Sequence, residues 1–240
     1  MRSLALLEAH EGRFDRAREL LGDAVTGSTA ASDTLGAVIA RLLRSEVAMT
    51  QGDSAIALAD LAAVERYAEA KPLPYEVVAH AVKLLARARA TPRAAALLAR
   101  LESQTTAISG TARARLLIAR GEVLLARGRV GEGRAALEQA LALEPTPESK
   151  ESAAFAAAAA NDPVQAATRY DSLAAGRGID WDGHVVIELG KYLAARAWER
   201  AGYPDRARPR YQAFLADWAA APSDSSLPAV RDARRRLLSP

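Results

Sequence analysis

The feature that most constrains this chain is a short pattern that recurs six times along its 240 residues. Each copy has a turn position, glycine in four of the six, and a small residue follows five positions later. The turn positions are Gly12, Gly52, Ala90, Gly128, Asn161 and Gly202, and the small residues are Ala17, Ala57, Ala95, Gly133, Ala166 and Ala207. Because the copies lie 33 to 41 residues apart, we expect a stack of repeated units without a single central core.

The clearest copy of the pattern is the stretch 113–147. Leucines recur at helical spacing before Gly128, which predicts a first helix with one apolar face. Small and aliphatic residues recur in the same way after Gly128, and they predict a second helix that Pro145 and Pro147 end. Gly121 and Gly133 lie where the two helices must approach most closely. The stretch therefore predicts one helix–turn–helix unit.

This unit resembles a tetratricopeptide (TPR) repeat, a helix pair of about 34 residues. The resemblance implies an all-α fold, a right-handed TPR-like superhelical solenoid of about six antiparallel helix pairs plus a C-terminal cap helix. The expected units are residues 1–27, 33–71, 74–103, 111–147, 148–176 and 184–220, with the cap helix over 226–239. We expect residues 1–240 to form a single repeat domain.

Composition agrees with an all-α protein and excludes several other classes. Half of the residues are apolar, chiefly Ala and Leu, which favour helices and close helix packing. The chain has no cysteine, so disulfides and thiolate metal sites are excluded. No apolar run reaches the roughly 18 residues of a membrane span, and Glu8 makes the N-terminal segment a poor signal peptide. We therefore expect a cytoplasmic protein with no membrane contact.

The two ends of the chain indicate a larger parent protein. The first helix is short and opens without a polar cap, so we expect residues 1–240 to be part of a longer chain. At the other end, a series of residues resembles the TPR regions of bacterial eukaryotic-like Ser/Thr kinases and of TPR-containing transcriptional regulators. These residues are Tyr211, Phe214, Leu215, Trp218, Leu227 and Pro228. Kinase motifs are missing from the sequence. The resemblance therefore implies a non-catalytic scaffold or sensor module of a bacterial signalling protein, with any kinase domain upstream.

The strongest candidate for a metal site is a loop that contains Asp180, Asp182 and His184. No further ligand is near in sequence, so a plain loop with Trp181 packed on a neighbouring helix is the favoured interpretation. The serine, threonine and histidine residues show no recognisable nucleophile–base arrangement. We therefore predict no enzyme, and no catalytic, cofactor-binding or metal-binding residues.

In TPR proteins the first helix of each pair usually lines a concave groove that holds the partner. In the register above, this face presents the peptide-groove candidates Arg87, Arg115, Ile118, Glu122, Phe155, Tyr192, Arg196 and Arg200. The four arginines would form a ladder that suits the carboxylates of an extended acidic peptide. The competing interpretation of any one of these residues is ordinary solvated helix surface.

The alternative function is that of a nucleic-acid-binding helical repeat, since the isoelectric point is about 9.4. However, the net charge is only +3, and aromatic and basic residues do not alternate as in nucleic-acid-binding surfaces. Nucleic acid is therefore the less favoured partner, and a protein or peptide is the expected one.

Overall fold

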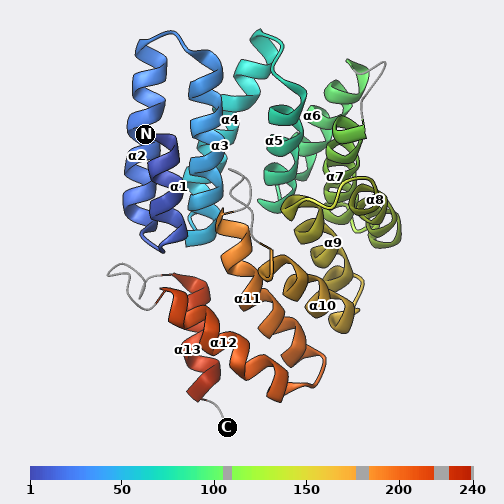
Figure 1. Cartoon of the computed structure of the whole chain (residues 1–240). Helices are drawn as coiled ribbons and strands as arrows, with labels where there is room; N and C mark the ends of the chain where they lie inside the picture. The colour runs from blue at the N-terminus through green and yellow to red at the C-terminus, as the bar shows by residue number, and fades with distance from the viewer. Residues whose placement is uncertain (105–109, 177–183, 219–226, 239–240) are drawn as a thin grey trace.

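The computed structural model describes residues 1–104, 110–176, 184–218 and 227–238, and within these ranges the chain forms thirteen α-helices and no strand. Consecutive helices pack as antiparallel pairs, and the pairs stack in chain order along a curved path (Figure 1). The predicted all-α solenoid of helix pairs is thus confirmed.

The helices have the following bounds. The first six are α1 (Arg2–His10), α2 (Phe14–Ala30), α3 (Thr34–Gln51), α4 (Ser54–Ala70), α5 (Tyr75–Arg87) and α6 (Thr91–Ser103). The next six are α7 (Gly110–Ala126), α8 (Val130–Leu143), α9 (Pro147–Ala159), α10 (Pro163–Ala174), α11 (His184–Arg200) and α12 (Pro204–Trp218). The helix α13 (Pro228–Leu238) follows, within the range predicted for the cap helix.

The turn inside each pair has one residue in the left-handed region, where glycine is favoured. These residues are Gly12, Gly52, Arg89, Gly128, Asn161 and Gly202. The repeat pattern predicts the third turn position at Ala90, which is one residue after the left-handed residue Arg89. The small residue of that unit is consequently Ala94, which is fully buried, and not Ala95, which is half-buried. The error arose because a turn with neither glycine nor asparagine, the residues that most readily adopt this conformation, does not mark its left-handed position.

Two helix boundaries also differ from expectation. The first unit was expected to end at residue 27, but α2 continues to Ala30. Thr29 donates its hydroxyl to the carbonyl of Val25 one turn earlier, which lets a threonine stay within a helix. Pro147 was expected to end α8 but is the first residue of α9, and Thr146 caps that helix by accepting from the amide of Ser149.

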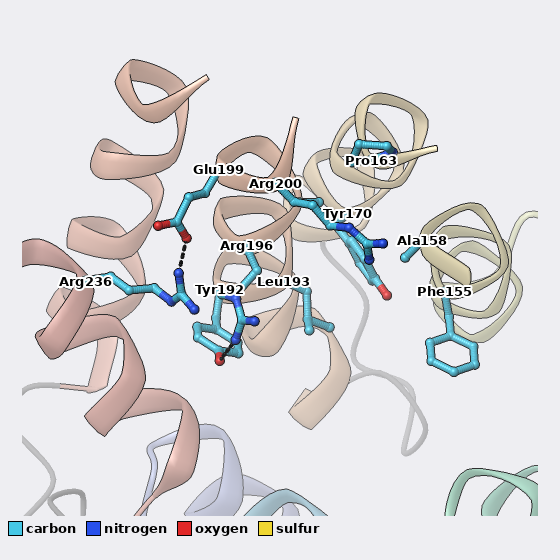
Figure 2. A pocket seen from close by; sticks show the side chains of 11 residues that line it. Phe155, Ala158, Pro163, Tyr170, Tyr192, Leu193, Arg196, Glu199, Arg200 and Arg236 are labelled. Atoms are coloured by element: carbon cyan, nitrogen blue, oxygen red, sulfur yellow. Dashed lines mark hydrogen bonds and ion pairs between the residues drawn. The ribbon is translucent and has the colours of Figure 1, made fainter. Parts of the chain in front are cut away.

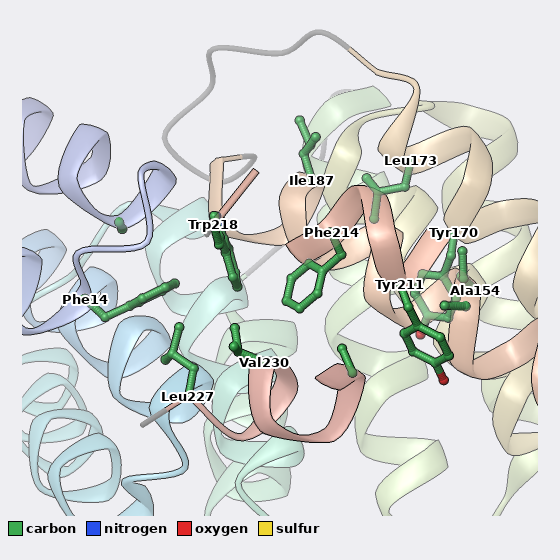
Figure 3. Packing of buried hydrophobic residues seen from close by; sticks show 14 of the residues in the cluster. Phe14, Ala154, Tyr170, Leu173, Ile187, Tyr211, Phe214, Trp218, Leu227 and Val230 are labelled. Atoms are coloured by element: carbon green, nitrogen blue, oxygen red, sulfur yellow. The ribbon is translucent and has the colours of Figure 1, made fainter. Parts of the chain in front are cut away.

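The two ends of the stack contact each other. Trp218 at the end of α12 packs edge-on against Phe14 of α2, with 5.3 Å between ring centroids. The Trp218 indole also donates to the backbone carbonyl of His10, at 3.1 Å. Figure 3 shows Phe14 and Trp218 in the same apolar cluster as Leu227, the residue before α13, and Val230 in its first turn. The first and last units therefore share one apolar core, while separate apolar clusters lie elsewhere in the stack, so no single central core serves the described residues.

Helix α5 lies in the middle of the stack and is surrounded by neighbours. Every residue from Val77 to Ala86 is buried. Its apolar side chains belong to a second core that also draws on α3, α4, α6 and α7. A helix buried on all sides must also bury its polar residues, and α5 contains a histidine, a lysine and an arginine. Their surroundings are described next.

Candidate functional site

Charged side chains of α5 are almost completely buried and are paired with α9. His80 is 2% exposed and Lys83 is 4% exposed. The Lys83 ammonium lies 2.9 Å from a carboxylate oxygen of Glu151 and 3.6 Å from one of Glu148. Because an unpaired charge in the interior is strongly unfavourable, these two carboxylates of α9 are what allow Lys83 to be buried.

Arg87, the last residue of α5, extends this pairing to α7. Its guanidinium donates to both carboxylate oxygens of Glu122, each at 2.6 Å, and to Glu151 at 3.0 Å. It also lies 3.7 Å above the ring centroid of Phe155 on α9, a cation–π contact. On α7, Arg115 donates to Glu148 at 2.9 Å. Three helices that follow one another in the stack are thus joined by charge-assisted hydrogen bonds.

We call these residues, with Glu46 of α3, the ionic cluster. Its members are Glu46, His80, Lys83, Arg87, Arg115, Glu122, Glu148 and Glu151. Burial alone would raise the pKa of the Glu148 and Glu151 carboxyls, but the cations nearby, Lys83 first for Glu148, outweigh it. The pKa of Glu148 is held well below its usual range, and that of Glu151 is lowered to about 2.

His80 completes the charge balance of the ionic cluster. Burial would lower the pKa of its imidazole, but the hydrogen bond to Glu148 and the charges of Glu46 and Glu148 raise it overall, against an opposing effect of Lys83. With His80 protonated, the four carboxylates face four cations and the cluster is neutral.

The ionic cluster changes the interpretation of half of the sequence-predicted groove residues. Arg87 and Arg115 were expected to extend toward a bound peptide, but they are paired with carboxylates of the chain itself. Glu122 is 1% exposed beneath Arg87, and Ile118 packs in a small core with α8. The physical reason is the curvature of the stack, which brings α9 and its two glutamates over the inner faces of α5 and α7.

The other half of the predicted groove lies around an open pocket, which we call the main pocket (Figure 2). It has a volume of about 490 Å³ and lies among α9, α10, α11 and α13. Its lining consists of Phe155, Ala158, Pro163, Tyr170, Tyr192, Leu193, Arg196, Ala197, Glu199, Arg200 and Arg236. Four of the predicted residues, Phe155, Tyr192, Arg196 and Arg200, are therefore brought together.

A second hollow, the side pocket, shares Phe155 with the main pocket. Its volume is about 310 Å³. It is lined by Ala86, Arg87, Arg89, Thr91, Glu122, Leu125, Ala126, Phe155 and Ala159. The aromatic ring of Phe155 thus belongs to both hollows and to the ionic cluster contact with Arg87.

Two of the three arginines in the main pocket are neutralised by carboxylates. Asp232 of α13 accepts from Arg196 at 2.9 Å, from Arg236 at 2.8 Å and from the Tyr192 hydroxyl at 2.9 Å. Burial would raise the pKa of the Asp232 carboxyl, but these donors lower it to about 2. Arg236 also pairs with Glu199. Helix α13 therefore supplies the counter-charge for this end of the pocket.

Arg200 and Tyr170 differ from the other polar groups of the pocket. Arg200 donates to the side-chain carbonyl of Asn161 at 2.8 Å, a neutral acceptor. Tyr170 is only 4% exposed, yet its hydroxyl has no hydrogen-bond partner among the described residues. Figure 2 shows that hydroxyl pointing into the space between Leu193 and Phe155. Burial, with the nearby charge of Glu151, raises the pKa of Tyr170 well above its usual value, so the phenol stays neutral.

Sequence reasoning missed several residues of this region. Lys83, Glu148 and Glu151 belong to the ionic cluster, and Tyr170, Asp232 and Arg236 belong to the main pocket or its support. One signal was present in the sequence, because two glutamates lie three residues apart in the alanine-rich helix α9. Tyr170 gave no such signal, because it follows Ala166 and Ala167 at the spacing of an ordinary core position.

The candidate metal loop lies outside the described residues, apart from the backbone of His184 at the start of α11. Within the described ranges, no group of three or more His, Asp or Glu side chains is arranged to hold a metal ion. In the same ranges, no helix has both the length and the apolar character needed to cross a membrane.

Comparison with known proteins places the fold. No protein-family model matches the sequence, and no curated protein matches it. A tetratricopeptide repeat protein from Parabacteroides merdae is similar over 98% of this chain and 81% of its own, with a TM-score of 0.59 and 12% identity. PilW, a widely conserved type IV pilus biogenesis factor, matches over 94% of this chain and 95% of its own, with a TM-score of 0.48 and 15% identity. The TPR domain of P58(IPK) matches over 97% and 77%, with a TM-score of 0.36 and 15% identity. The first of these similarities shows that the chain has a TPR-like fold.

Proposed function

We propose that this chain is a non-catalytic scaffold that binds an extended, acidic protein segment in the main pocket and the side pocket. The observation that carries the proposal is the pair of hollows that share Phe155. The main pocket has the size of ordinary ligand sites and the mixture of aromatic and arginine side chains that is enriched where proteins bind partners. Two adjoining hollows fit successive side chains of one peptide better than a single compact molecule.

Fewer arginines are available to the peptide than the ladder expected from sequence contains. Of the four arginines, Arg87 and Arg115 are held by internal carboxylates, and Arg196 is held by Asp232. The acidic segment is therefore expected to meet Arg200 first. The C-terminal resemblance to TPR regions of bacterial kinases and regulators supports a cytoplasmic sensor or scaffold role in a signalling protein, as part of the same proposal.

The test uses a fluorescein-labelled peptide of alternating glutamate and phenylalanine residues, blocked at both ends, with fluorescence anisotropy as the measurement. Replacing Phe155 removes the ring common to both pockets, so Phe155→Ala should weaken binding by about tenfold or more. The matched control is Leu143→Ala, since Leu143 is an exposed apolar side chain of α8 outside both pockets. Equal affinities for wild type, Phe155→Ala and Leu143→Ala would contradict the proposal.

Nucleic acid is the second candidate, and one observation favours it. Helices α12 and α13 carry the exposed arginines Arg208, Arg231, Arg234 and Arg235. A nucleic-acid-binding protein would lose affinity steeply as salt rises, and it would depend on these residues more than on Phe155. Binding of a random DNA duplex that is abolished by the double change Arg208→Glu and Arg234→Glu, and unaffected by Phe155→Ala, would favour this second candidate.

A further inference from the structure

The charges of the main pocket leave one cation without a carboxylate. Asp232 and Glu199 are the carboxylates in and beside this pocket, and their contacts are to Arg196, Arg235, Arg236 and two tyrosine hydroxyls. Arg200, at the end of α11, contacts only the amide oxygen of Asn161 among the described residues. Guanidinium groups bind carboxylates more strongly than neutral amides, so Arg200 retains the capacity to bind an anion.

The hydroxyl of Tyr170 is an independent observation in the same pocket. The Tyr170 side chain is 4% exposed and lines the pocket, and its hydroxyl makes no hydrogen bond to the other described residues, so it is available to a ligand. Tyr170 is held in place by α10 and its hydroxyl faces the pocket, where an incoming group would reach it (Figure 2). Because the phenol is neutral, it can donate its proton to an acceptor of the ligand.

The rest of the pocket wall is apolar. Phe155, Leu193, Pro163 and Ala158 line it between the polar groups. A lone small anion would leave these surfaces in contact with water, whereas a peptide places an apolar side chain beside an acidic one. The shared ring of Phe155 also continues the wall into the side pocket, which gives the neighbouring residues of such a peptide a place to lie.

We propose that the main pocket binds one acidic side chain of the bound segment, whose carboxylate accepts hydrogen bonds from Arg200 and Tyr170. An apolar side chain next to it in the peptide packs against Phe155 and Leu193. This inference rests on the proposed function and assigns the residues that select the peptide. It makes Tyr170 a specificity residue, although the helical pattern of α10 alone indicates an ordinary core position.

The experiment compares the glutamate–phenylalanine peptide with a counterpart in which every glutamate is glutamine. The variants are Arg200→Gln and Tyr170→Phe. Their controls are Arg120→Gln, an exposed arginine paired with Glu102, and Tyr203→Phe, an exposed tyrosine on the turn before α12. Each control makes the same chemical change away from both pockets, so it shows the effect of the change itself.

For the glutamate peptide, Kd should rise about tenfold in Arg200→Gln and about threefold in Tyr170→Phe, since each removes a hydrogen bond to a charged acceptor. The two controls should bind like wild type. The glutamine peptide should bind wild type more weakly, and Arg200→Gln should not change its Kd. Tyr170→Phe should keep or raise the melting temperature, because the hydroxyl it removes has no partner in the fold.

Three results would overturn the inference, and they separate it from the proposed function. If both peptides bind wild type equally and only Phe155→Ala weakens them, the groove binds peptides but does not select acidic side chains. If the blocked glutamate peptide does not bind and a copy with a free C-terminal carboxylate does, the pocket binds a chain end. If Tyr170→Phe lowers the melting temperature clearly, the hydroxyl is a structural donor. Failure of the proposed function itself would appear as binding that ignores Phe155→Ala.

Discussion

In the ionic cluster, the guanidinium groups of Arg87 and Arg115 pair with carboxylates of α7 and α9. In the main pocket, the guanidinium of Arg200 donates instead to the side-chain amide oxygen of Asn161. These three arginines lie on first helices of their pairs, and Phe155 is in contact with both regions. The difference follows from burial. An arginine that is closed in by neighbouring helices requires a carboxylate, while an exposed one can rely on an amide and solvent. The position of an arginine in the repeat indicates that it lies on the inner face, but its burial decides whether it remains open to a partner.

The largest expected effect comes from removing one carboxylate of the ionic cluster. Glu148→Gln removes the carboxylate that Lys83 and Arg115 share and leaves buried cations undercompensated. We expect a loss of about 3–5 kcal/mol in the free energy of unfolding, measured by urea denaturation. Glu102→Gln is the matched control, since its partner Arg120 is largely exposed, and its loss should be about 0–1 kcal/mol. Equal losses for the two variants would mean that the cluster is solvated and the comparison is wrong.

The next effect concerns the helix contact that positions Glu122 beneath Arg87. Gly121 of α7 meets Gly133 of α8, and a Cβ added at Gly133 would lie 3.0 Å from the Gly121 carbonyl oxygen and 2.8 Å from the side chain of Leu125. Sequence alone predicts that Gly133→Ala is neutral or stabilising, through helix propensity. The structure instead predicts a loss of about 1–3 kcal/mol from overpacking.

Gly131, in the same helix, provides the control for this change. A Cβ added there meets nothing within 4 Å. Gly131→Ala should therefore stabilise the protein by about 0.5–1 kcal/mol, because alanine is the better helix former. Both values come from thermal or urea unfolding, and a stabilising Gly133→Ala would show that the two helices can move apart without loss.

A smaller effect should distinguish the two regions by pH. The pKa of His80 is raised in the folded protein, so protonated His80 stabilises the fold fully below its unfolded pKa of about 6.5. That contribution is lost as the pH rises through the folded pKa, because Glu46 and Glu148 then face a neutral imidazole beside Lys83. Wild-type stability should fall over this range, and His80→Gln should flatten the dependence.

Peptide binding in the main pocket should show no matching pH dependence. Tyr170 stays neutral and Asp232 stays ionised across the range in which His80 titrates, because the pKa of Tyr170 is raised and that of Asp232 is lowered to about 2. Anisotropy titrations at several pH values above neutral would check this. A Kd that follows the stability curve of the ionic cluster would mean that the two regions act as one.

The smallest expected effect on stability is that of removing the Arg200 guanidinium from the main pocket. Arg200→Gln should change the free energy of unfolding by no more than about 0.5 kcal/mol, since an exposed arginine hydrogen-bonded to an amide contributes little. The measurement is urea denaturation beside the binding assay. A loss as large as that of Glu148→Gln would mean that Arg200 is structural and that the open region has been misassigned.

The repeats are well predicted from the sequence because, in each unit, residues of that same unit mark the turn and the close contact between its helices. Gly128 and Gly133 mark one unit within a few residues, and no distant information is needed. Where the left-handed residue was neither glycine nor asparagine, as at Arg89, the predicted register shifted by one position. Local chemistry thus gives the helices and the stacking order of the pairs.

The partners across the stack could not be predicted in the same way. Glu148 neutralises Lys83 from 65 residues further along the chain, at a distance set by the curvature of three helix pairs. No local pattern encodes that curvature, so arginines expected to face a ligand were found paired internally. The contact between Trp218 and Phe14 depends on the same accumulated curvature.

The contact between the ends of the stack has a consequence for how the protein is made. Trp218 and His10 are 208 residues apart, yet the Trp218 indole donates a hydrogen bond to the backbone carbonyl of His10. A chain that leaves the ribosome at about 5–20 residues per second emerges with its first helix pair some 10–40 seconds before Trp218. During that interval the ring of Phe14 lacks its contact with Trp218. The unit that contains Phe14 is therefore completed only after Trp218 has emerged, long after its own helices have formed.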